Sequence, residues 1–215
     1  MARRTKEEAE ATRTRLLDAA LQVFNEKGVA GASLAEVAAV AGVTRGAIYW
    51  HFRDKPALLD ALIQRTVLPF ETAFERSAAN GSGGALSRLL DVLRLVLKTI
   101  MVDKVAQSVF ILVLFKVAYV GDVQTMRTWR IESIERFTKH IEDALQSAAM
   151  EMGLPMHIPF HQAARGVRAV FDGILLEWLL CQGTAFDLES EGISALEVHL
   201  RGLGLGQENN LCKTF

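Results

Sequence analysis

Cysteine, proline and net charge are all scarce in this chain, and each shortage narrows what the protein can be. The 215 residues include two cysteines and four prolines, and the formal net charge is −1. Cys181 and Cys212 show no metal or redox spacing, so we interpret them as buried, incidental thiols. Few prolines, long helical periods and no alternating strand pattern predict an all-α fold.

A hydrophobic run long enough to cross a membrane is also missing. The most apolar segment, 105–120, contains seven consecutive apolar residues, Val109–Phe115, whereas a membrane span needs about 20. Alone, this run is compatible with a buried strand, but in an all-helical chain it predicts a helix buried nearly all round. The amino terminus is charged and polar to about Arg15, so no signal peptide is visible. We expect a cytoplasmic protein without a membrane partner.

Signatures of catalysis are missing as well. The five histidines form neither an H-E-x-x-H motif nor a convincing metal spacing, because Pro159 lies between the close pair His157 and His161. No G-x-S-x-G motif and no glycine-rich phosphate loop is found. We therefore expect no catalytic residue, no metal site and no cofactor.

Apolar side chains, by contrast, are abundant. Half of the residues (50%) are hydrophobic, and the mean hydropathy is +0.20. This composition predicts an extensive core, or faces buried against a partner chain. The first 66 residues carry 10 Lys and Arg against 8 Asp and Glu, and the remainder carries 14 against 17. A mildly basic end on a mildly acidic body suits a DNA-binding end.

The stretch 33–55 predicts two short helices joined by a tight turn. Ser33 and Glu36 have the S-x-x-E spacing of a capping box. Apolar residues follow at helical spacing: Leu34, Val37, Ala38 and Ala41. Gly42 can adopt the left-handed conformation of a turn, and Thr44 can cap a second helix. Helix, glycine turn and helix are the layout of a DNA-reading helix-turn-helix.

The second helix, which runs to about Phe52, has the two faces that a DNA reader needs. Ile48 and Phe52 point into the core, whereas Arg45, Gly46 and Tyr49 share the opposite side. An arginine in the first turn can pair with guanine in the major groove, and a glycine lets the backbone approach closely. An ordinary helical hairpin with a solvated polar face is the alternative interpretation.

Neighbouring side chains can add phosphate contacts. Tyr49 and Trp50 offer a phenol and an indole beside the basic groups of Arg53 and Lys55. Residues 1–6 form a basic arm that reaches phosphates or the minor groove, or that only keeps the terminus soluble.

From about Arg13 to Leu62 the chain resembles the DNA-binding domain of the TetR family of bacterial regulators. The matching pieces are L-D-A-A-x-x-x-F at 17–24, Gly28, A-G-V-T-R-G-A-I-Y-W-H-F at 41–52, and Lys55. The recognition helix is similar to that of the AcrR-like branch, which represses multidrug efflux pumps. The family's phosphate contact from His51 requires the helix to end there. The predicted DNA-binding residues are Arg3, Arg4, Ser33, Thr44, Arg45, Gly46, Tyr49, Trp50, His51 and Lys55.

The same features predict how the chain is organised. We expect a three-helix DNA-binding domain at 1–54, a larger helical ligand-binding and dimerisation domain at 55–205, and a disordered tail at 206–215. The helix that opens at Lys55 acts in the family as the lever between ligand and head, and Pro69 should kink or break it. About nine helices are expected in all, including 7–27, 85–102, 122–152, 160–182 and 188–205.

The last two helices carry more apolar surface than one bundle can hide. Their apolar residues occupy more than one face, among them Val170, Ile174, Leu176, Leu179 and Leu180. An isologous four-helix interface would bury this surface, so we expect a homodimer through about 160–205, as the family implies. Two heads would then read the half-sites of a palindromic operator.

Aromatic and flexible apolar residues fall on the helices that, as the resemblance to the family implies, would surround a central cavity, although any one of them can belong to the plain core. The predicted ligand-binding residues are Phe70, Phe74, Leu93, Leu97, Phe110, Leu114, Ile134, Phe137, Ile141, Phe171 and Trp178. Polar anchors are few, with Gln107, Ser133 and Asp172 as candidates. We expect weak, promiscuous binding of a hydrophobic aromatic molecule.

Together these features predict a dimeric repressor of a multidrug efflux operon that a hydrophobic, drug-like inducer releases from its operator DNA. Two alternatives stay open. One is a TetR-family regulator of metabolic genes, and the other is a helical protein that binds small molecules but not DNA.

Overall fold

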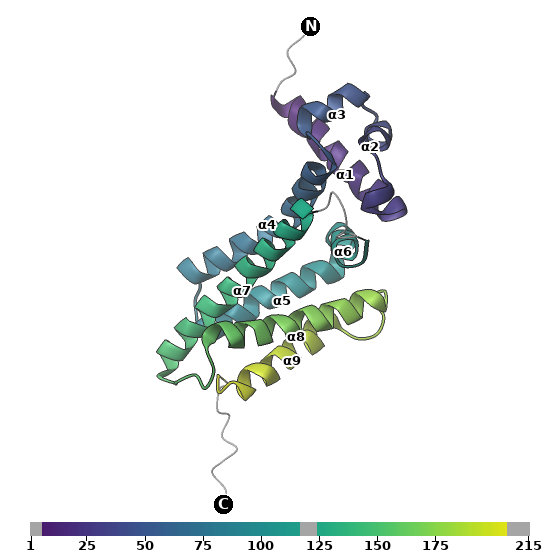
Figure 1. The fold of residues 1–215 in the computed structure, drawn as a ribbon. Coiled ribbons are helices and arrows are strands. Elements are labelled where there is room, and N and C mark those ends of the chain that lie inside the picture. The colour runs from purple at the N-terminus through teal and green to yellow at the C-terminus, as the bar shows by residue number, and fades with distance from the viewer. Residues whose placement is uncertain (1–5, 117–123, 206–215) are drawn as a thin grey trace, which may run out of the picture. The chain divides into compact units, whose positions relative to one another are not determined.

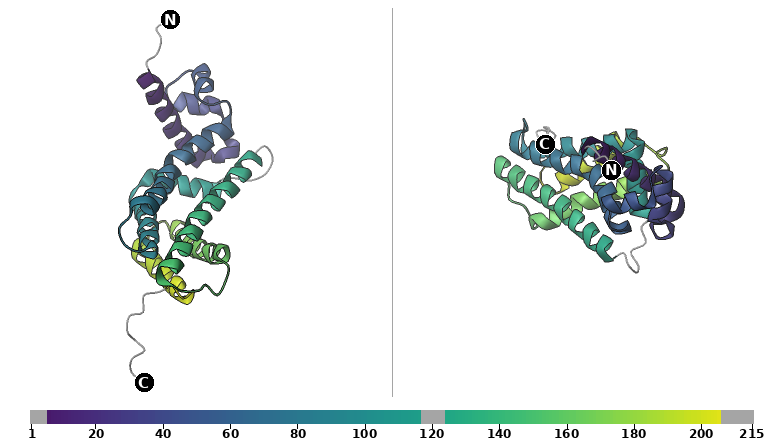
Figure 2. Two further views of the ribbon diagram at one scale, coloured as in Figure 1. Left: turned by 90° about the vertical axis from the view of Figure 1, so that its left-hand side faces the viewer. Right: turned by 90° about the horizontal axis from the view of Figure 1, so that it is seen from above.

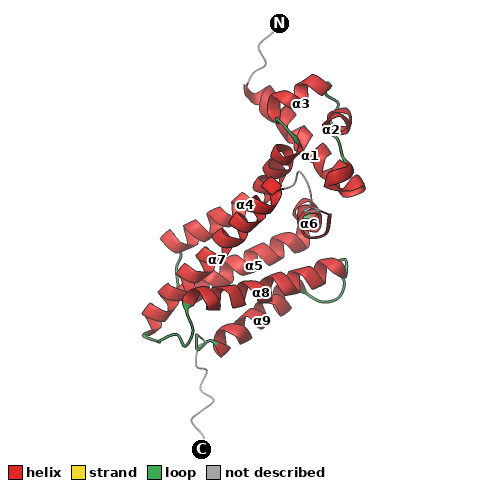
Figure 3. Ribbon diagram, viewed as in Figure 1, coloured by secondary structure: helices red, strands yellow, loops and turns green. Residues whose placement is uncertain are grey.

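The computed structural model describes residues 6–116 and 124–205, and all regular elements in these two ranges are helical (Figure 3). The α-helices, labelled in Figure 1, are α1 (Lys6–Gly31), α2 (Leu34–Val40), α3 (Arg45–His51), α4 (Lys55–Asn80), α5 (Ala85–Val102), α6 (Lys104–Ile111), α7 (Gln124–Met152), α8 (Phe160–Leu180) and α9 (Leu188–Gly202). A five-residue π-helix, η1 (Leu112–Lys116), follows α6 directly. The predicted all-α fold, with a helix-turn-helix head and a larger helical body, is confirmed.

Packing separates the chain into two compact units. The first comprises Met1–Pro69 and Lys104–Ile131, and the second comprises Phe70–Asp103 and Glu132–Phe215. Helices α4 and α7 each contribute one part to both units. The division predicted after residue 54 does not coincide with this packing boundary, and it stays a prediction.

The first unit is built around α1. Its inward face packs on α2, α6 and η1, and its leucines and Phe24 join one apolar core with residues from α2, α3, α4, α6 and η1. That core includes Leu16, Phe24, Val37, Ile48, Phe52, Leu58, Leu62, Val109 and Leu112. The segment 104–113 therefore shares a core with the helix-turn-helix, although about 50 residues separate them in the sequence.

A glycine near the end of α1 introduces a non-helical residue beside Lys116 of η1. Gly28 has φ 71° and ψ 161°, a backbone conformation that glycine adopts without a steric penalty. This non-helical residue interrupts the regular i to i−4 hydrogen bonds, which leaves carbonyl oxygens before it available. The Lys116 ammonium donates to the Asn25 carbonyl at 2.6 Å. The sequence predicts a helix over 7–27 that stops at Gly28, and the non-helical backbone of Gly28 agrees with this stop; a short helical segment follows it to Gly31.

Two predictions about helices need correction. The segment after residue 104 is not buried nearly all round, because Val105 is 46% exposed and Phe115 is 41% exposed. Only one face of α6 and η1 packs on the first unit's core, and residues 117–120 of the predicted helix lie outside the described residues. Of the two outcomes predicted for Pro69, a kink or a break, the break is wrong, because α4 continues as a helix from Lys55 to Asn80. Burial of Leu62 before the proline and Phe74 after it offsets the roughly 3 kcal/mol that an internal proline costs.

The second unit is a helical bundle in which α9 lies against both α5 and α8. The views in Figures 1 and 2 show α8 and α9 running side by side. Gly192 on α9 permits a close approach, since a Cβ atom there would lie 2.7 Å from Leu97 Cδ1. Asp187 caps α9 by accepting from the Ser190 amide at 2.8 Å. This capping bond holds the pKa of Asp187 below its ordinary value.

Candidate nucleic-acid interface and ligand site

Local hydrogen bonds fix the two short helices of the head. The Ser33 hydroxyl accepts from the Glu36 amide at 3.2 Å, and the Ser33 amide donates to Glu36 Oε2 at 2.9 Å, so the predicted capping box is present. Gly42 has φ 66°, the left-handed conformation expected of the turn. Thr44 caps α3 by accepting from the Ala47 amide at 3.3 Å. Three polar residues and one glycine thus set where α2 begins and ends and where α3 begins.

An ion pair reinforces the start of α2. Glu36 also accepts from the ammonium of Lys27 on α1. Hydrogen bonding to Lys27, and then to Ser33, lowers the pKa of the Glu36 carboxyl from 4.5 to about 2. The same contact raises the pKa of Lys27. The pair ties the helix-turn-helix to the helix that braces it.

The outer face of α3 presents side chains that can reach DNA. Ile48 is fully buried, whereas Arg45 and Gly46 are exposed, and a Cβ atom on Gly46 would meet nothing within 4 Å. Tyr49 is 49% exposed and Trp50 is 91% exposed. An indole so open to water on a structured helix is unusual for a residue with no partner to bind.

Helix α3 ends at His51, as a phosphate contact from this position requires. Phe52, the C-cap, has extended backbone angles of φ −138° and ψ 119°. Its side chain returns to the core, where the guanidinium of Arg13 lies 5.5 Å from the ring centroid. The His51 ring is half-buried and lies 6.3 Å from the Phe52 ring. The sequence pattern did not indicate the contact made by Arg13, because it joins residues 39 positions apart.

Lys55 has a role inside the head. Its ammonium donates to the carbonyl oxygens of Ala30 at 3.0 Å and Ala32 at 2.9 Å. These bonds fasten the first turn of α4 to the end of α1 and to the connection that follows it. Arg65 adds a second tie from α4, to Asp18 on α1 at 2.8 Å. Of the other predicted DNA contacts, Arg3 and Arg4 lie outside the described residues.

In the second unit, three phenylalanines form a continuous row across three helices. Phe137 on α7 lies edge-to-face with Phe74 on α4 at 5.6 Å and with Phe171 on α8 at 5.5 Å between ring centroids. An ion pair between Arg136 and Glu71, at 3.0 Å, joins α4 to α7 beside this row. Phe137 is only half-buried. The row therefore combines a preorganised aromatic surface with partial access from solvent.

The structure brings only part of the predicted ligand-binding set together. Ile141, Phe70, Leu93 and Leu97 are buried in the second unit with the aromatic row, and Ile134 there is half-buried. Phe110 and Leu114 belong to the first unit and are half-buried.

Trp178 and the predicted polar anchors have partners within the protein. The Trp178 indole donates to the Phe186 carbonyl at 3.2 Å and packs over Gly183, where a Cβ atom would lie 2.9 Å from Cζ2. This tryptophan holds the connection between α8 and α9. Cys181, which caps the end of α8, is exposed and not buried as predicted, because it begins this surface connection. The polar candidates are bonded on their own helices, as in the 2.5 Å pair between Arg168 and Asp172.

Apolar side chains remain uncovered on α8 and α9. Leu180 is 62% exposed and Val198 is 66% exposed, and Leu176 is also exposed. Leu179, which was expected to belong to this surplus, is buried within the unit. The described part of the chain has no group of three or more His, Cys, Asp or Glu residues placed to hold a metal. No helix there has both the length and the apolar character needed to traverse a bilayer.

Comparison with known proteins identifies the family. The model of "Bacterial regulatory proteins, tetR family" matches residues 16–62, and the model of "MAATS-type transcriptional repressor, C-terminal region" matches residues 85–204. The transcriptional regulator AcrR of Shigella flexneri is 34% identical over 198 residues, which cover 89% of this chain and 88% of that protein. The chain belongs to the TetR family.

Other relatives of this TetR-family chain are also regulators. TtgR of Pseudomonas putida is 33% identical over 180 residues, which cover 84% of this chain and 86% of that protein. NalD, the secondary repressor of the MexAB-OprM multidrug efflux pump in Pseudomonas aeruginosa, superposes with a TM-score of 0.79 at 27% identity, covering 92% of this chain and 98% of NalD. The SmeT–triclosan complex gives a TM-score of 0.79 at 28% identity, with 89% and 91% covered. These relatives are transcriptional regulators rather than enzymes, and the predicted resemblance to efflux repressors is confirmed.

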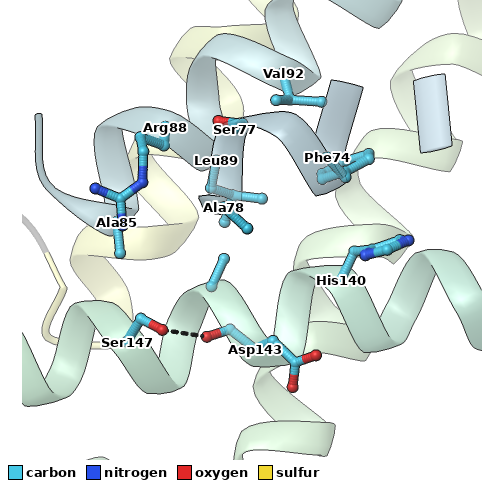
Figure 4. Close-up of a pocket in the computed structure, with 11 residues that line it drawn as sticks. Phe74, Ser77, Ala78, Ala85, Arg88, Leu89, Val92, His140, Asp143 and Ser147 are labelled. Carbon is cyan, nitrogen blue, oxygen red and sulfur yellow. Dashed lines mark hydrogen bonds between the residues drawn. The ribbon is translucent and has the colours of Figure 1, made fainter. Parts of the chain in front are cut away.

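Sequence reasoning missed some side chains of this TetR-family body. Arg88 and His140 face a cavity beside the aromatic row (Figure 4), yet neither was among the predicted anchors. His140 follows Phe137 by three residues, so the two share one face of α7. Helical spacing could have indicated His140, whereas Arg88 is placed by contacts with residues far along the chain.

Proposed function

We propose that this TetR-family chain is a homodimeric repressor that binds a palindromic operator through α3 and leaves it when a hydrophobic ligand binds the body. The observation that carries the proposal is the outer face of α3. On this face, Arg45 and Gly46 are exposed, and Tyr49 and Trp50 present exposed aromatic side chains that can donate hydrogen bonds. The helix has Thr44 as its N-cap and Phe52 as its C-cap.

Each residue of that face has a chemical role in the proposed complex. Arg45, in the first turn, pairs with a guanine edge in the major groove, and Gly46 lets the helix approach the bases. Tyr49, Trp50 and His51 lie toward the end of the recognition helix, away from the first turn that meets the bases. Their hydroxyl and ring N–H groups therefore donate to phosphates of the DNA backbone. We assign the capping residues Ser33 and Thr44 to the flanking phosphates, where helix starts favour anions.

Lys55 takes a positioning role in this proposal. Two of its three ammonium donors already bond to carbonyls at the end of α1 and in the connection that follows it. Its proposed effect on DNA binding is to hold α3 at the correct angle, with one donor left for a phosphate. The basic residues Arg3 and Arg4 add contacts that are independent of DNA sequence.

Dimerisation through α8 and α9 supplies the second head. The exposed Leu176, Leu180 and Val198 support this interface, since large apolar side chains on a stable helix pair favour burial against a second copy. Two identical heads require a palindromic operator.

The ligand is proposed to contact the aromatic row and the apolar residues around it. Phe74, Phe137 and Phe171 offer ring edges and faces, which suit planar aromatic molecules. SmeT, a structural relative, has been solved with triclosan, so triclosan is a suitable first probe. For strong release, the ligand must favour the conformation that does not bind DNA by several kcal/mol.

A binding experiment tests the recognition face. An operator is selected from random duplex DNA with the wild-type protein, and its affinity is measured by gel shift at two salt concentrations. Arg45→Ala should weaken binding by about 1–3 kcal/mol, or roughly 5- to 150-fold, if the arginine reads guanine. Arg76→Ala, at an exposed arginine of α4 in the second unit, is the matched control. Equal affinity of the Arg45 variant, the control and the wild type would refute this assignment.

A further inference from the structure

Arg13 occupies a position on α1 where the helical pattern calls for an apolar side chain. Leu16, Leu17 and Ala20 follow it by three, four and seven residues, the spacing of one helix face, and all three are buried. Arg13 is half-buried, whereas Arg15, two positions further along, is exposed. The aliphatic part of Arg13 therefore continues the apolar face of α1, and its charged group lies at the edge of the head's core.

The guanidinium of Arg13 reaches the end of the recognition helix. Its Cζ atom lies 5.5 Å from the ring centroid of Phe52, which is 4% exposed and is the C-cap residue of α3. The His51 ring lies 6.3 Å from the same ring. In Figure 1 the amino-terminal part of α1 correspondingly lies beside α3. One buried ring thus positions an arginine from α1 and a histidine from α3 near each other.

No carboxylate neutralises Arg13 in the described part of the chain. The ion pairs found in the described head are Lys27–Glu36, Arg53–Asp54 and Arg65–Asp18. Glu10 precedes Arg13 by three residues, a spacing at which ion pairs form on a helix, yet the guanidinium lies over Phe52 instead. A cation–π contact needs no hydrogen bond. The five N–H donors of Arg13 therefore remain available to a group outside the described residues.

A phosphate matches such a guanidinium in charge and in shape. Arginine binds phosphate oxygens through two parallel N–H bonds. A helix that enters the major groove with its first turn carries its other end towards the DNA backbone. Phosphates follow one another at about 3.4 Å of helix rise along each strand. Two donors held beside the Phe52 ring can therefore serve neighbouring phosphates.

We propose that Arg13 is a further DNA-binding residue, which donates to a backbone phosphate next to the phosphate that His51 contacts. The two side chains form a clamp that is supported by the Phe52 ring. This inference rests on the proposed operator binding through α3, and it gives α1 a direct contact with DNA in addition to its bracing role. Because phosphates carry no base information, the contact strengthens binding to every sequence equally.

The test measures how the DNA affinity of the full-length protein depends on salt. Gel shifts at several KCl concentrations use the selected operator and a scrambled duplex. One phosphate contact contributes about 0.9 to the slope of log K against log salt concentration. Arg13→Met keeps an unbranched apolar chain without the charge, so this slope should be smaller in magnitude by about 0.9, and affinity for both duplexes should fall roughly tenfold. A substitution that only loosens the head lowers the affinity but leaves the slope unchanged.

Two further variants serve as controls. Arg13→Lys retains the charge but not the paired donors, so it should keep the wild-type slope and lose less affinity than Arg13→Met. Arg15→Met removes the same charge from the exposed side of α1, where Arg15 bonds to Thr12 at 3.3 Å. Its slope should equal that of the wild type, and its affinity should stay within about twofold.

A second measurement locates the contact on the DNA. Operators are made in which one phosphate at a time is replaced by a neutral methylphosphonate. The wild type should lose affinity at two neighbouring phosphates of one strand. Arg13→Met should become insensitive at one of them, and His51→Ala at the other.

The outcomes separate this inference from the proposed function. A wild type that binds the operator no better than the scrambled duplex refutes operator recognition, while the slopes on the scrambled duplex still test Arg13. The role of Arg13 is overturned if Arg13→Met keeps the wild-type slope, if Arg15→Met changes the slope equally, or if Arg13→Met remains sensitive at both phosphates. A wild type that binds neither duplex overturns both proposals.

Discussion

Replacing Phe137 with alanine removes the middle ring of the aromatic row. Its two edge-to-face partners, Phe74 and Phe171, lie 5.6 and 5.5 Å away on different helices. The substitution therefore breaks aromatic contacts from α7 to both α4 and α8. It leaves the head unit unchanged in sequence, which separates effects on the ligand from effects on DNA.

The size of the effect follows from the number of contacts. Each aromatic pair contributes about 0.5–1.5 kcal/mol beyond the area that it buries, and a buried phenylalanine loses about 3–5 kcal/mol on truncation to alanine. Because Phe137 is half-buried, we expect the free energy of unfolding to fall by about 2–4 kcal/mol. For a chain of 215 residues this corresponds to a melting temperature lower by roughly 4–16 °C.

The functional consequence is measured on the folded variant. Triclosan affinity by calorimetry should fall about tenfold or more, which is 1.4 kcal/mol, while operator affinity by gel shift stays within about twofold of wild type. Phe137→Leu retains apolar volume without a ring, so it should recover stability better than ligand affinity. Phe115→Ala, at an exposed ring of the first unit, is the control for losing any phenylalanine.

Two results would refute this reasoning. If Phe137→Ala loses stability but binds triclosan as the wild type does, the aromatic row is plain core. If operator affinity falls in proportion to ligand affinity, the substitution has disturbed the whole protein rather than the ligand site.

Three other predictions concern the head and the dimer. The pKa of Glu36 in the folded protein, about 2, lies below its ordinary value of 4.5. The ionised carboxylate therefore contributes stability that is present above pH 4.5 and is lost as the pH falls towards 2. Thermal melts of Glu36→Gln at acid pH should lack this part of the pH dependence, and pH profiles identical to wild type would contradict the prediction. Lys55→Met removes two charge-assisted hydrogen bonds and should lower the free energy of unfolding by about 1–3 kcal/mol in urea titrations, whereas a pure phosphate contact would leave stability unchanged. Leu180→Asp places a charge on the exposed apolar face of α8 and should give monomers by light scattering at micromolar concentration; an unchanged dimer would place the interface elsewhere.

The helix-turn-helix could be predicted from the sequence because short-range interactions define it. The capping box of Ser33 and Glu36, the turn at Gly42 and the cap at Thr44 each depend on residues no more than three positions apart. Such interactions survive any tertiary arrangement that keeps the helices, so sequence spacing alone predicts them. The apolar spacing of Ile48 and the helical periods of the body are local in the same sense.

Contacts between residues far apart in the sequence could not be predicted in this way. The ammonium of Lys55 meets carbonyls 23 and 25 residues away, and Arg88 meets Glu151 at a separation of 63 residues. Pro69 was expected to interrupt α4, because its local cost is visible in the sequence while the burial on either side is not. Exposure of Phe115 depends likewise on which neighbours cover it.

The sequence by itself determined the helical class, the head's caps and turn, and the side of α3 that faces outward, since these follow from backbone sterics and periodicity within a few residues. Tertiary structure alone decided that 104–113 shares the head's core and that Trp178 anchors a connection. It also decided that Phe74 and His140 form one wall of a cavity. Those outcomes depend on which helices pack together, and a list of neighbours along the chain does not contain that information.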